Sequence, residues 1–375
     1  MVSNHVSIVF GGPSPEHEIS ILTGLQCERV LRGAGGTQIN PIYVDQGGRW
    51  HLVPANTEAR DFTAGAPAGS RELAVQLSPE PGVWTKKGLR TQRVDLGVVM
   101  NATHGSLGEG GGFASIFELM GVPATGGSAW ASALSMDKYA FGTALRAAGI
   151  PTLPRELLTE TSTHVIEGPL IVKPRFGGSS IGIEVADDIE TARALLRSSI
   201  HMRNGAVVEP YRSDLRDYNV SFRTYPAFEV SEIERPLRPE VGSAIYSYEE
   251  KYLNESGLQG APREMPAVIS EKTRDAIHSY ARGVADVTGI TGIVRVDFLS
   301  NDDEVFVNEA NSIPGAMALY LWTNVPVDRL LLDAIEEVRK NPPRSSATTS
   351  HNRSSALQAA GGIAGKLAGL NVERQ

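Results

Sequence analysis

Short apolar runs alternate with helix-like stretches over the first hundred residues. The apolar runs predict strands at residues 5–10, 39–46 and 96–105, with an edge strand at 48–53. A helix is predicted between the first two strands, over residues 20–33. Strands that alternate with helices are typical of a parallel sheet, so we expect an α/β domain here.

Two polar loops follow strands of this predicted sheet. They read FGGPSPEHE at residues 10–18 and ATHGSLGEGGG at residues 102–112. Ligands of such sheets bind beyond the carboxyl ends of the strands, so both loops are expected to face one cleft. The first loop fits neither the GxGxxG nor the GxxxxGK[ST] nucleotide pattern. A functional loop and an ordinary strand-to-helix turn are therefore both open at this point.

The rest of the chain is predicted to form mixed helices and strands. Helices are predicted at 113–121, 128–149, 191–199, 271–289 and 326–340, and strands at 169–174, 206–211 and 217–225. A glycine-rich turn into a strand is predicted at 175–186, a long polar loop at 245–265 and a hairpin at 292–315. Residues 341–356 are rich in Ser, Thr and Pro, which predicts disorder, and 357–370 are weakly helical.

Composition and charge limit the classes of protein. The 375 residues are 41% hydrophobic, which suits two or three domains, and the net charge of −8 argues against nonspecific nucleic-acid binding. The single cysteine, Cys27, cannot form an intramolecular disulfide and is predicted as a small apolar residue of the first helix. The start of the chain lacks a basic region, and no apolar run reaches the roughly 18 residues of a membrane span. We therefore expect a soluble cytoplasmic protein without nucleic-acid or membrane partners.

Four polar residues of the predicted hairpin are candidates for a metal site. Arg295 and Asp297 lie two apart on one strand, and Glu309 and Asn311 lie two apart on the other, so each pair shares a face. The two pairs converge if 297 lies opposite 309, which requires an odd-length loop or a bulge. Two carboxylates about 4 Å apart repel by about 4 kcal/mol at an effective dielectric near 20, and bound Mg²⁺ removes that penalty. A solvated hairpin face is the alternative.

Cations occur before this hairpin. Lys173 ends a predicted strand and precedes the loop 177–180, whose N–H groups and hydroxyls could fold over phosphates. Lys138 and Lys251 are further cations, in the segments SMDKYA and YSYEEKY. Each lysine alone is more often a solvated surface residue. Their combination with the candidate metal hairpin indicates a phosphate site.

Several motifs along the chain carry a family resemblance. In order, they read GGPSPEHEIS, HGSLGEGG, ALSMDK, IVKPRFGGSSIG, YSYEEKY, GIVRVDF and VNEANSIPG. In this order they resemble the motifs of the D-alanine–D-alanine ligases, a family of the ATP-grasp superfamily. The resemblance spans residues 5–340. It implies a three-domain ATP-grasp architecture of α/β and α+β type with an N-terminal parallel-sheet domain, and a homodimer.

The resemblance also implies domain boundaries and a reaction. The implied domains are an N-terminal α/β substrate-binding domain at 1–126, a central ATP-grasp module at 127–206, a C-terminal module at 207–340 and a flexible tail at 341–375. In the implied reaction, ATP with Mg²⁺ (or Mn²⁺) phosphorylates the carboxylate of one D-alanine. The amine of a second D-alanine then attacks the acyl phosphate.

The resemblance assigns residues to ATP and the metal. Those that match phosphate ligands are Lys138, Lys173, Ser180 and Lys251. Glu209 resembles the acceptor on the adenine side, and Asp217 stands where the family usually has a glutamate for the ribose hydroxyls. The residues that match Mg²⁺ ligands are Asp297, Glu309 and Asn311.

Other matches concern the amino-acid substrates. Glu16 matches the glutamate that binds the ammonium of the first D-alanine, and Ser179 and Tyr252 match its partners across the closed site. His104 fits the first-substrate pocket, whereas His17 is expected to have no chemical role. The pair that would stabilise the tetrahedral oxyanion is Arg295 with the backbone N–H of Gly315. Closure of the 245–265 loop would exclude water from the acyl phosphate.

The sequence departs from the family at three places. Gly110 replaces an aspartate, and Gly177 replaces a glutamate, which should make its loop more mobile. Tyr320 and Leu321 stand where the family has a serine-leucine pair, whose serine binds the acceptor carboxylate. Either the ring of Tyr320 enters the acceptor pocket or it packs outward.

Three functions are consistent with these observations. The first is an ATP-dependent D-alanine–D-alanine ligase for peptidoglycan precursors. The second is a related ligase that joins a D-amino acid to another acceptor in specialised metabolism or resistance, as the altered acceptor segment suggests. The third is a noncatalytic nucleotide-binding protein, which the presence of the cationic, metal and oxyanion residues disfavours.

Overall fold

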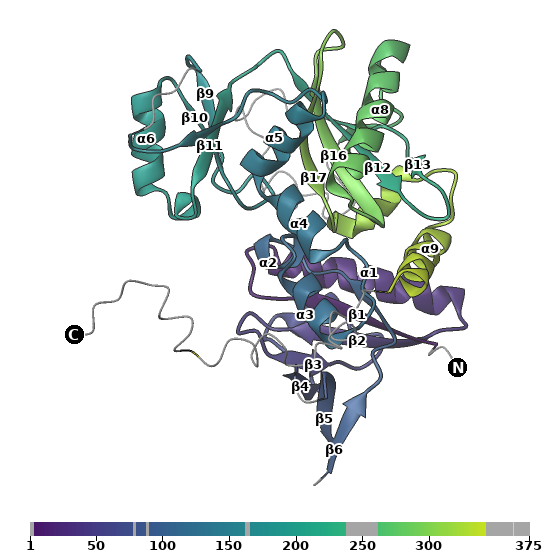
Figure 1. Ribbon diagram of the computed structural model, residues 1–375. Helices are drawn as coiled ribbons and strands as arrows, with labels where there is room; N and C mark the ends of the chain where they lie inside the picture. The colour runs from purple at the N-terminus through teal and green to yellow at the C-terminus, as the bar shows by residue number, and fades with distance from the viewer. Residues whose placement is uncertain are drawn as a thin grey trace, which may run out of the picture.

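The protein is built around three larger β-sheets (Figure 1). The computed structural model describes residues 4–77, 80–87, 90–161, 166–237, 262–342 and 363. In Figure 1 the sheet of N-terminal residues lies at the bottom, and the other two lie above it at left and right. This arrangement agrees with the mixed α/β and α+β class expected from the sequence.

The N-terminal sheet has seven strands in the order β6-β5-β4-β3-β2-β1-β7. The strands are β1 (His5–Gly11), β2 (Gln38–Val44), β3 (Trp50–Leu52), β4 (Arg71–Gln76), β5 (Gly82–Lys87), β6 (Arg90–Val94) and β7 (Val98–Asn101). β1 is parallel to β2 and β7, as predicted, whereas β2 to β6 pair antiparallel. The segment predicted as an edge strand was misplaced, because β3 lies between β2 and β4. The sequence prediction missed β4 to β6; the side chains of β4 and β6 are largely polar and exposed.

Helices cover both faces of this sheet. Alternation along β1 sends Ile8 towards α1 (His17–Ala34) and α9 (Val327–Lys340), and Val9 towards α3 (Gly112–Met120). Two short helical segments, η1 (Ala59–Phe62) and α2 (Ser106–Glu109), complete this part. Cys27 lies on α1 and is fully buried, which confirms its predicted role, and burial raises the pKa of its thiol to about 12.

The second sheet has four strands in the order β10-β9-β11-β8. They are β8 (Glu156–Leu158), β9 (Leu170–Pro174), β10 (Glu184–Ala186) and β11 (Ala206–Pro210), all paired antiparallel. α6 (Ile189–Ser198) packs Ala192 against Leu170 and Val172 of β9, and η2 (Ile200–Met202) follows it. The strands predicted at 169–174 and 206–211 and the helix predicted at 191–199 are thereby confirmed.

The third sheet has the order β13-β12-β16-β17. Its strands are β12 (Arg216–Arg223), β13 (Glu229–Val230), β16 (Ile293–Ser300) and β17 (Val305–Asn311), and a separate pair is β14 (Arg235–Pro236) with β15 (Arg263–Glu264). α8 (Glu271–Thr288) and α5 (Lys138–Ala147) bury Ile277 and Phe141 in the hydrophobic cluster under this sheet.

The single helix predicted at 128–149 is wrong. The segment forms α4 (Ala129–Met136) and α5, which meet at Asp137. The carboxylate of Asp137 accepts hydrogen bonds from the backbone N–H groups of Tyr139 and Ala140, so it caps a new helix instead of continuing the first. This break places Lys138 in the first turn of α5.

The predicted domain boundaries stay predictions. β11 begins at Ala206 and runs across the predicted boundary at 206/207, and α9 packs on the N-terminal sheet. Most of the tail after 342, and most of the loop predicted at 245–265, lie outside the described residues. Among the described residues, no helix is both long and apolar enough to cross a membrane.

Candidate active site

A cavity of about 920 Å³ lies where the three larger sheets meet. Its walls come from α1, β9, β11, β12, β16, β17 and the segment η4 (Gly315–Leu321). The predicted nucleotide residues that line it are Lys138, Lys173, Ser180, Glu209 and Asp217. The predicted metal residues Asp297, Glu309 and Asn311 line it too. So do Glu16, His104, Ser179, Arg295, Gly315 and Tyr320. Lys251 and Tyr252 fall outside the described residues.

Glu16 and Ser179 join two sheets across the cavity. The Ser179 hydroxyl, in the loop after β9, donates a hydrogen bond to Oε1 of Glu16, which precedes α1. Burial raises the pKa of Glu16, and the nearby charge of Glu109 raises it further. The turn before Glu16 requires glycine, because a Cβ on Gly11 (φ 89°) would lie 2.2 Å from the Val44 carbonyl oxygen. The turn therefore serves both packing and the position of Glu16.

His104 is held in a chain of hydrogen bonds that the sequence analysis missed. Its Nδ1 lies 3.1 Å from Oε1 of Glu109, and its Nε2 lies 2.9 Å from the Thr23 hydroxyl. The Thr23 oxygen in turn accepts the backbone N–H of Ala316 at 3.1 Å. A carboxylate oxygen accepts hydrogen bonds, so Nδ1 of His104 is the donor to Glu109, and Nε2 of His104 lies within hydrogen-bond distance of the Thr23 hydroxyl. The chain links the N-terminal sheet to η4.

His17 has a structural role. Its ring nitrogens lie 2.7 Å from the Gly12 carbonyl oxygen and 3.0 Å from the Tyr43 hydroxyl, so both are used in packing the first turn of α1.

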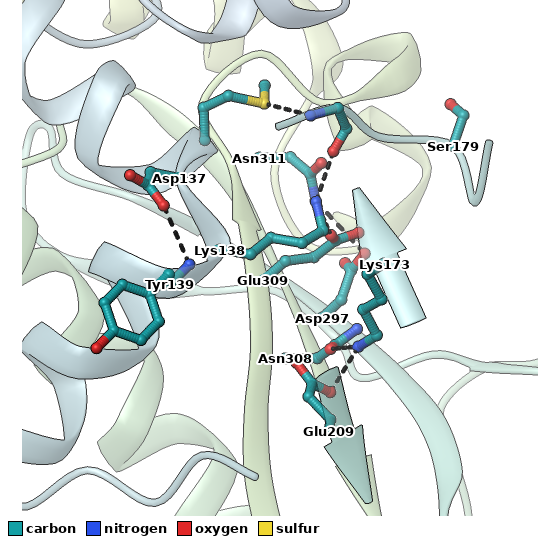
Figure 2. A network of polar contacts seen from close by, with 12 residues as sticks. Asp137, Lys138, Tyr139, Lys173, Ser179, Glu209, Asp297, Asn308, Glu309 and Asn311 are labelled. Carbon is teal, nitrogen blue, oxygen red and sulfur yellow. Dashed lines mark hydrogen bonds and ion pairs between the residues drawn. The ribbon is translucent and has the colours of Figure 1, made fainter. Parts of the chain in front are cut away.

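Lys173, Glu209 and Arg155 form a buried charge cluster (Figure 2 shows Lys173 and Glu209). Lys173 Nζ lies 2.7 Å from Oε2 of Glu209 and 3.0 Å from Oδ1 of Asn308. Arg155 Nε donates to Oε1 of Glu209, and its Nη1 donates to the Lys138 carbonyl oxygen at 3.0 Å. Burial alone would raise the pKa of Glu209, but the charges of Arg155 and Lys173 hold it below its ordinary value. Glu209 is therefore ionised and fixed between two cations.

Lys138 connects the loop after β9 to the hairpin. Its Nζ donates to the Gly177 carbonyl oxygen at 2.6 Å and lies 3.5 Å from Oε2 of Glu309. Gly177 has φ 126°, a conformation that residues with a side chain rarely adopt. The replacement of the family's glutamate by glycine thus coincides with a backbone geometry that glycine favours. The mobility predicted for this loop stays a prediction.

The predicted convergence of the hairpin residues is confirmed. Asp297 lies opposite Glu309 and Arg295 lies opposite Asn311, with a register shift between Asp297 and Phe298. The shift supplies the bulge that the sequence required. Arg295 donates to both carboxylate oxygens of Asp297, at 2.7 and 2.9 Å, and Asn311 Nδ2 lies 3.4 Å from Oδ2 of the same aspartate.

The donor set fits a hard cation. Asp297, Glu309 and Asn311 offer two carboxylates and one amide on the same wall of the cavity (Figure 2). In the part of the chain that the structure describes, no three His, Cys, Asp or Glu side chains cluster to form a complete metal cage. Mg²⁺ characteristically takes one or two carboxylates and completes its shell with water and substrate phosphates, so this incomplete set suits it.

Tyr320 and Leu321 of the acceptor segment lie in different surroundings. Tyr320 lines the cavity, and its hydroxyl donates to Oε2 of Glu234 at 3.1 Å. Burial raises the pKa of Tyr320, so the hydroxyl keeps its proton. Of the two alternatives for Tyr320, the structure therefore has the ring at the cavity. Leu321 does not line the cavity, and its side chain is completely buried in the core beside α9, so its substrate role stays a prediction.

Comparison with known proteins identifies the family. Residues 5–127 match the family described as D-ala D-ala ligase N-terminus, and residues 138–325 match D-ala D-ala ligase C-terminus. A D-alanine–D-alanine ligase of Campylobacter concisus is 32% identical over 321 residues, which cover 85% of this chain and 88% of the relative. The crystal structure of D-alanine–D-alanine ligase from Helicobacter pylori superposes with a TM-score of 0.69 at 25% identity, covering 88% of this chain and 98% of that one. VanG D-Ala:D-Ser ligase from Enterococcus faecalis shares the fold, with a TM-score of 0.71 at 21% identity, covering 90% of this chain and 99% of that one.

The fold and the family matches define an ATP-dependent ligase of the ATP-grasp type. The chain belongs to the D-alanine–D-alanine ligase family.

Proposed function

We propose that this chain joins two molecules of D-alanine into D-alanyl-D-alanine, with conversion of ATP to ADP and phosphate. The observation that carries the proposal is that residues assigned to ATP, metal, first substrate and oxyanion line one cavity, although they come from three different sheets. The same convergence speaks against a noncatalytic nucleotide-binding protein.

Glu16 binds the ammonium group of the first D-alanine. Its carboxylate is directed at the cavity and is held in place by Ser179. His104, fixed by Glu109 and Thr23, borders the same space. An ion pair with Glu16 orients the substrate so that its carboxylate points towards the phosphate site.

Lys138 and Lys173 bind the phosphate groups of ATP. A carboxylate oxygen of the first D-alanine attacks the γ-phosphorus, ADP leaves, and an acyl phosphate remains. Cations that neutralise the phosphoryl oxygens lower the barrier to this transfer. Asp297, Glu309 and Asn311 would hold Mg²⁺, which supplies further neutralisation of phosphate charge when bound.

Arg295 and the backbone N–H of Gly315 act in the second step. The amine of the second D-alanine attacks the acyl carbon, the tetrahedral oxyanion forms, and phosphate leaves as the amide is made. Preorganised donors stabilise the oxyanion without reorganising at the moment of reaction. Arg295 is preorganised by Asp297, which accepts hydrogen bonds from two of its nitrogens.

A ligase with a different acceptor is the second candidate. Tyr320 at the cavity wall favours it, because a rigid ring occupies the place of the family's small serine. The structural neighbour named D-Ala:D-Ser ligase is only 21% identical, so it supports the fold of this chain and not the identity of its acceptor. A role in cell-wall precursor synthesis, a cytoplasmic location and a homodimer accompany the first candidate as predictions.

The experiment is a pairwise screen of amino acids with ATP and Mg²⁺. D-alanine alone should release ADP and phosphate and give a product with the mass of D-alanyl-D-alanine. If ADP forms only when D-alanine is supplied together with another acceptor, the second candidate replaces the first. If no mixture containing D-alanine releases ADP, both candidates fail.

A further inference from the structure

An arginine lies over the ring of Tyr320 at the acceptor end of the cavity. The Cζ atom of Arg263, on β15, lies 4.6 Å from the ring centroid. Arg263 lines the cavity, and its side chain is 29% exposed. A guanidinium over an aromatic face is attracted by the ring quadrupole, so Tyr320 helps to fix its plane. Neither the motifs nor the family matches assign Arg263 a role.

A buried carboxylate holds this arginine from the other side. Nη1 of Arg263 lies 3.4 Å from Oε1 of Glu234, whose side chain is 7% exposed. The second oxygen of Glu234 accepts the Tyr320 hydroxyl at 3.1 Å and Nδ2 of Asn219 at 3.2 Å. Both oxygens of Glu234 are thus engaged by groups of the protein.

Among the described residues, Arg263 has donors left over that a ligand can use. A guanidinium carries five N–H donors in a planar fork that matches a carboxylate. Within the described ranges, Glu234 and the Tyr320 ring are the partners that the structure gives to Arg263. Tyr320 also lies close enough to Arg295 and Asp297 for their charges to act on its hydroxyl. Arg263 therefore borders the place where the second substrate must approach the acyl carbon.

We propose that Arg263 binds the carboxylate of the acceptor amino acid. This inference rests on the proposed function and deepens it. Tyr320 stands in place of the family's serine, and Arg263 on β15 supplies the missing partner as a fixed cation. The acceptor is then an amino acid with an unblocked carboxylate, because the guanidinium requires an anion. An amide in place of the carboxylate keeps the shape of the acceptor and loses the ion pair.

The test compares D-alanine with D-alaninamide as acceptors in the wild type, in Arg263→Met and in Arg235→Met. Arg235 is a matched control, because it lies on the paired strand β14 and forms an ion pair with Glu264 at 2.8 Å without lining the cavity. The readout is the ratio of kcat/KM for the two acceptors, with product mass identifying each dipeptide. A hydrogen-bonded charge pair contributes enough to lower this ratio about 10- to 150-fold in Arg263→Met. The ratio in Arg235→Met should stay at the wild-type value.

Two further variants separate direct contact from an indirect effect. Removal of Arg263 also leaves Glu234 without its cation, which could repel the acceptor carboxylate. In the double variant Arg263→Met with Glu234→Gln the repulsion is gone, so direct binding predicts that the ratio stays low. Arg263→Lys keeps the charge and should recover part of the ratio, which also covers the case in which Arg263→Met fails to fold.

The outcomes are distinct from those of the proposed function. If D-alanine releases no ADP in the wild type, the proposed function fails. The assignment of Arg263 alone is overturned if the wild type is active but shows equal kcat/KM for D-alanine and D-alaninamide. An unchanged ratio in Arg263→Met, or a full recovery in the double variant, overturns it as well.

Discussion

The nucleotide end and the acceptor end of the cavity are built in different ways. At the nucleotide end, Lys173, Glu209, Asp297 and Glu309 lie on neighbouring strands of two sheets, and their spacing is set by strand register. At the acceptor end, Tyr320, Glu234 and Arg263 come from three separate segments and meet through an ion pair, a hydrogen bond and a ring contact.

This difference predicts different consequences of substitution. The residues of the nucleotide end lie on strands that also carry core residues and the buried charge cluster. Substitutions there should therefore affect both catalysis and stability. Residues of the acceptor end are held mainly by one another. Their contacts with one another run through side chains, so this end is a natural place for a change of substrate.

The largest effect is expected from Glu309→Gln. The substitution removes one anionic ligand of the predicted Mg²⁺ site while keeping the size of the side chain, so turnover should fall below detection with the fold intact. The control is Asp303→Asn, an exposed residue in the turn of the same hairpin. Steady-state ADP release over a Mg²⁺ titration measures both. Normal turnover of Glu309→Gln with unchanged Mg²⁺ dependence would reject the metal assignment.

Arg155→Met should destabilise the nucleotide end. Arg155 is 1% exposed and completes the charge balance of Glu209, and loss of one partner of a buried pair costs about 3–5 kcal/mol. Urea unfolding should report this loss, and ATP affinity should weaken because Glu209 and Lys173 shift. Arg197→Met removes an exposed pair with Glu160 and should cost at most about 1 kcal/mol. Equal free energies of unfolding for the two variants would show that the Arg155–Glu209–Lys173 cluster does not stabilise the protein.

A smaller effect is expected at Glu16, and it depends on pH. Burial raises the pKa of Glu16 above its ordinary value of 4.5, so the carboxylate becomes protonated at a higher pH than a solvated glutamate. The KM of the first D-alanine should therefore rise as the pH falls through this raised pKa. Glu16→Gln should increase that KM about 10- to 150-fold at neutral pH and abolish its rise in acid. An acid limb that persists in Glu16→Gln would assign the titration to another group.

Tyr320→Phe should have the smallest effect. The change keeps the ring under Arg263 and removes only the hydrogen bond to Glu234, so the acceptor KM should rise about two- to tenfold. The KM of the first D-alanine and the affinity for ATP should not change. A rise in the first-site KM instead would mean that the two ends are not independent.

Periodic features of the site could be predicted from the sequence. Side chains alternate along a strand, so the spacing of Arg295, Asp297, Glu309 and Asn311 was enough to predict their shared face. The glycine turn before Glu16 was visible as a strand followed by two glycines, although only the structure shows how close Gly11 comes to Val44. The burial of Leu321 could not be predicted, because residues 316–318 adopt positive φ angles near 50°, which redirect the chain in a way that no periodicity reveals.

Long-range contacts account for what the sequence could not predict. Arg155 and Glu209 are 54 positions apart, and Arg155 follows a proline in a segment without a regular pattern. Thr23 reaches Ala316 from almost the other end of the chain. Glu109 lies in the HGSLGEGG motif, but its contact with His104 could not be predicted from the sequence. Such pairs depend on the packing of separate sheets and leave no local signal.

The central claim is that the cavity activates a D-alanine carboxylate by phosphorylation and then forms an amide. D-alanine labelled with ¹⁸O in its carboxylate tests this directly, because the oxygen that attacks the γ-phosphorus leaves with phosphate when the amide forms. The account predicts one ¹⁸O atom in the phosphate for each D-alanyl-D-alanine produced, as measured by mass spectrometry. Unlabelled phosphate released together with dipeptide would contradict it.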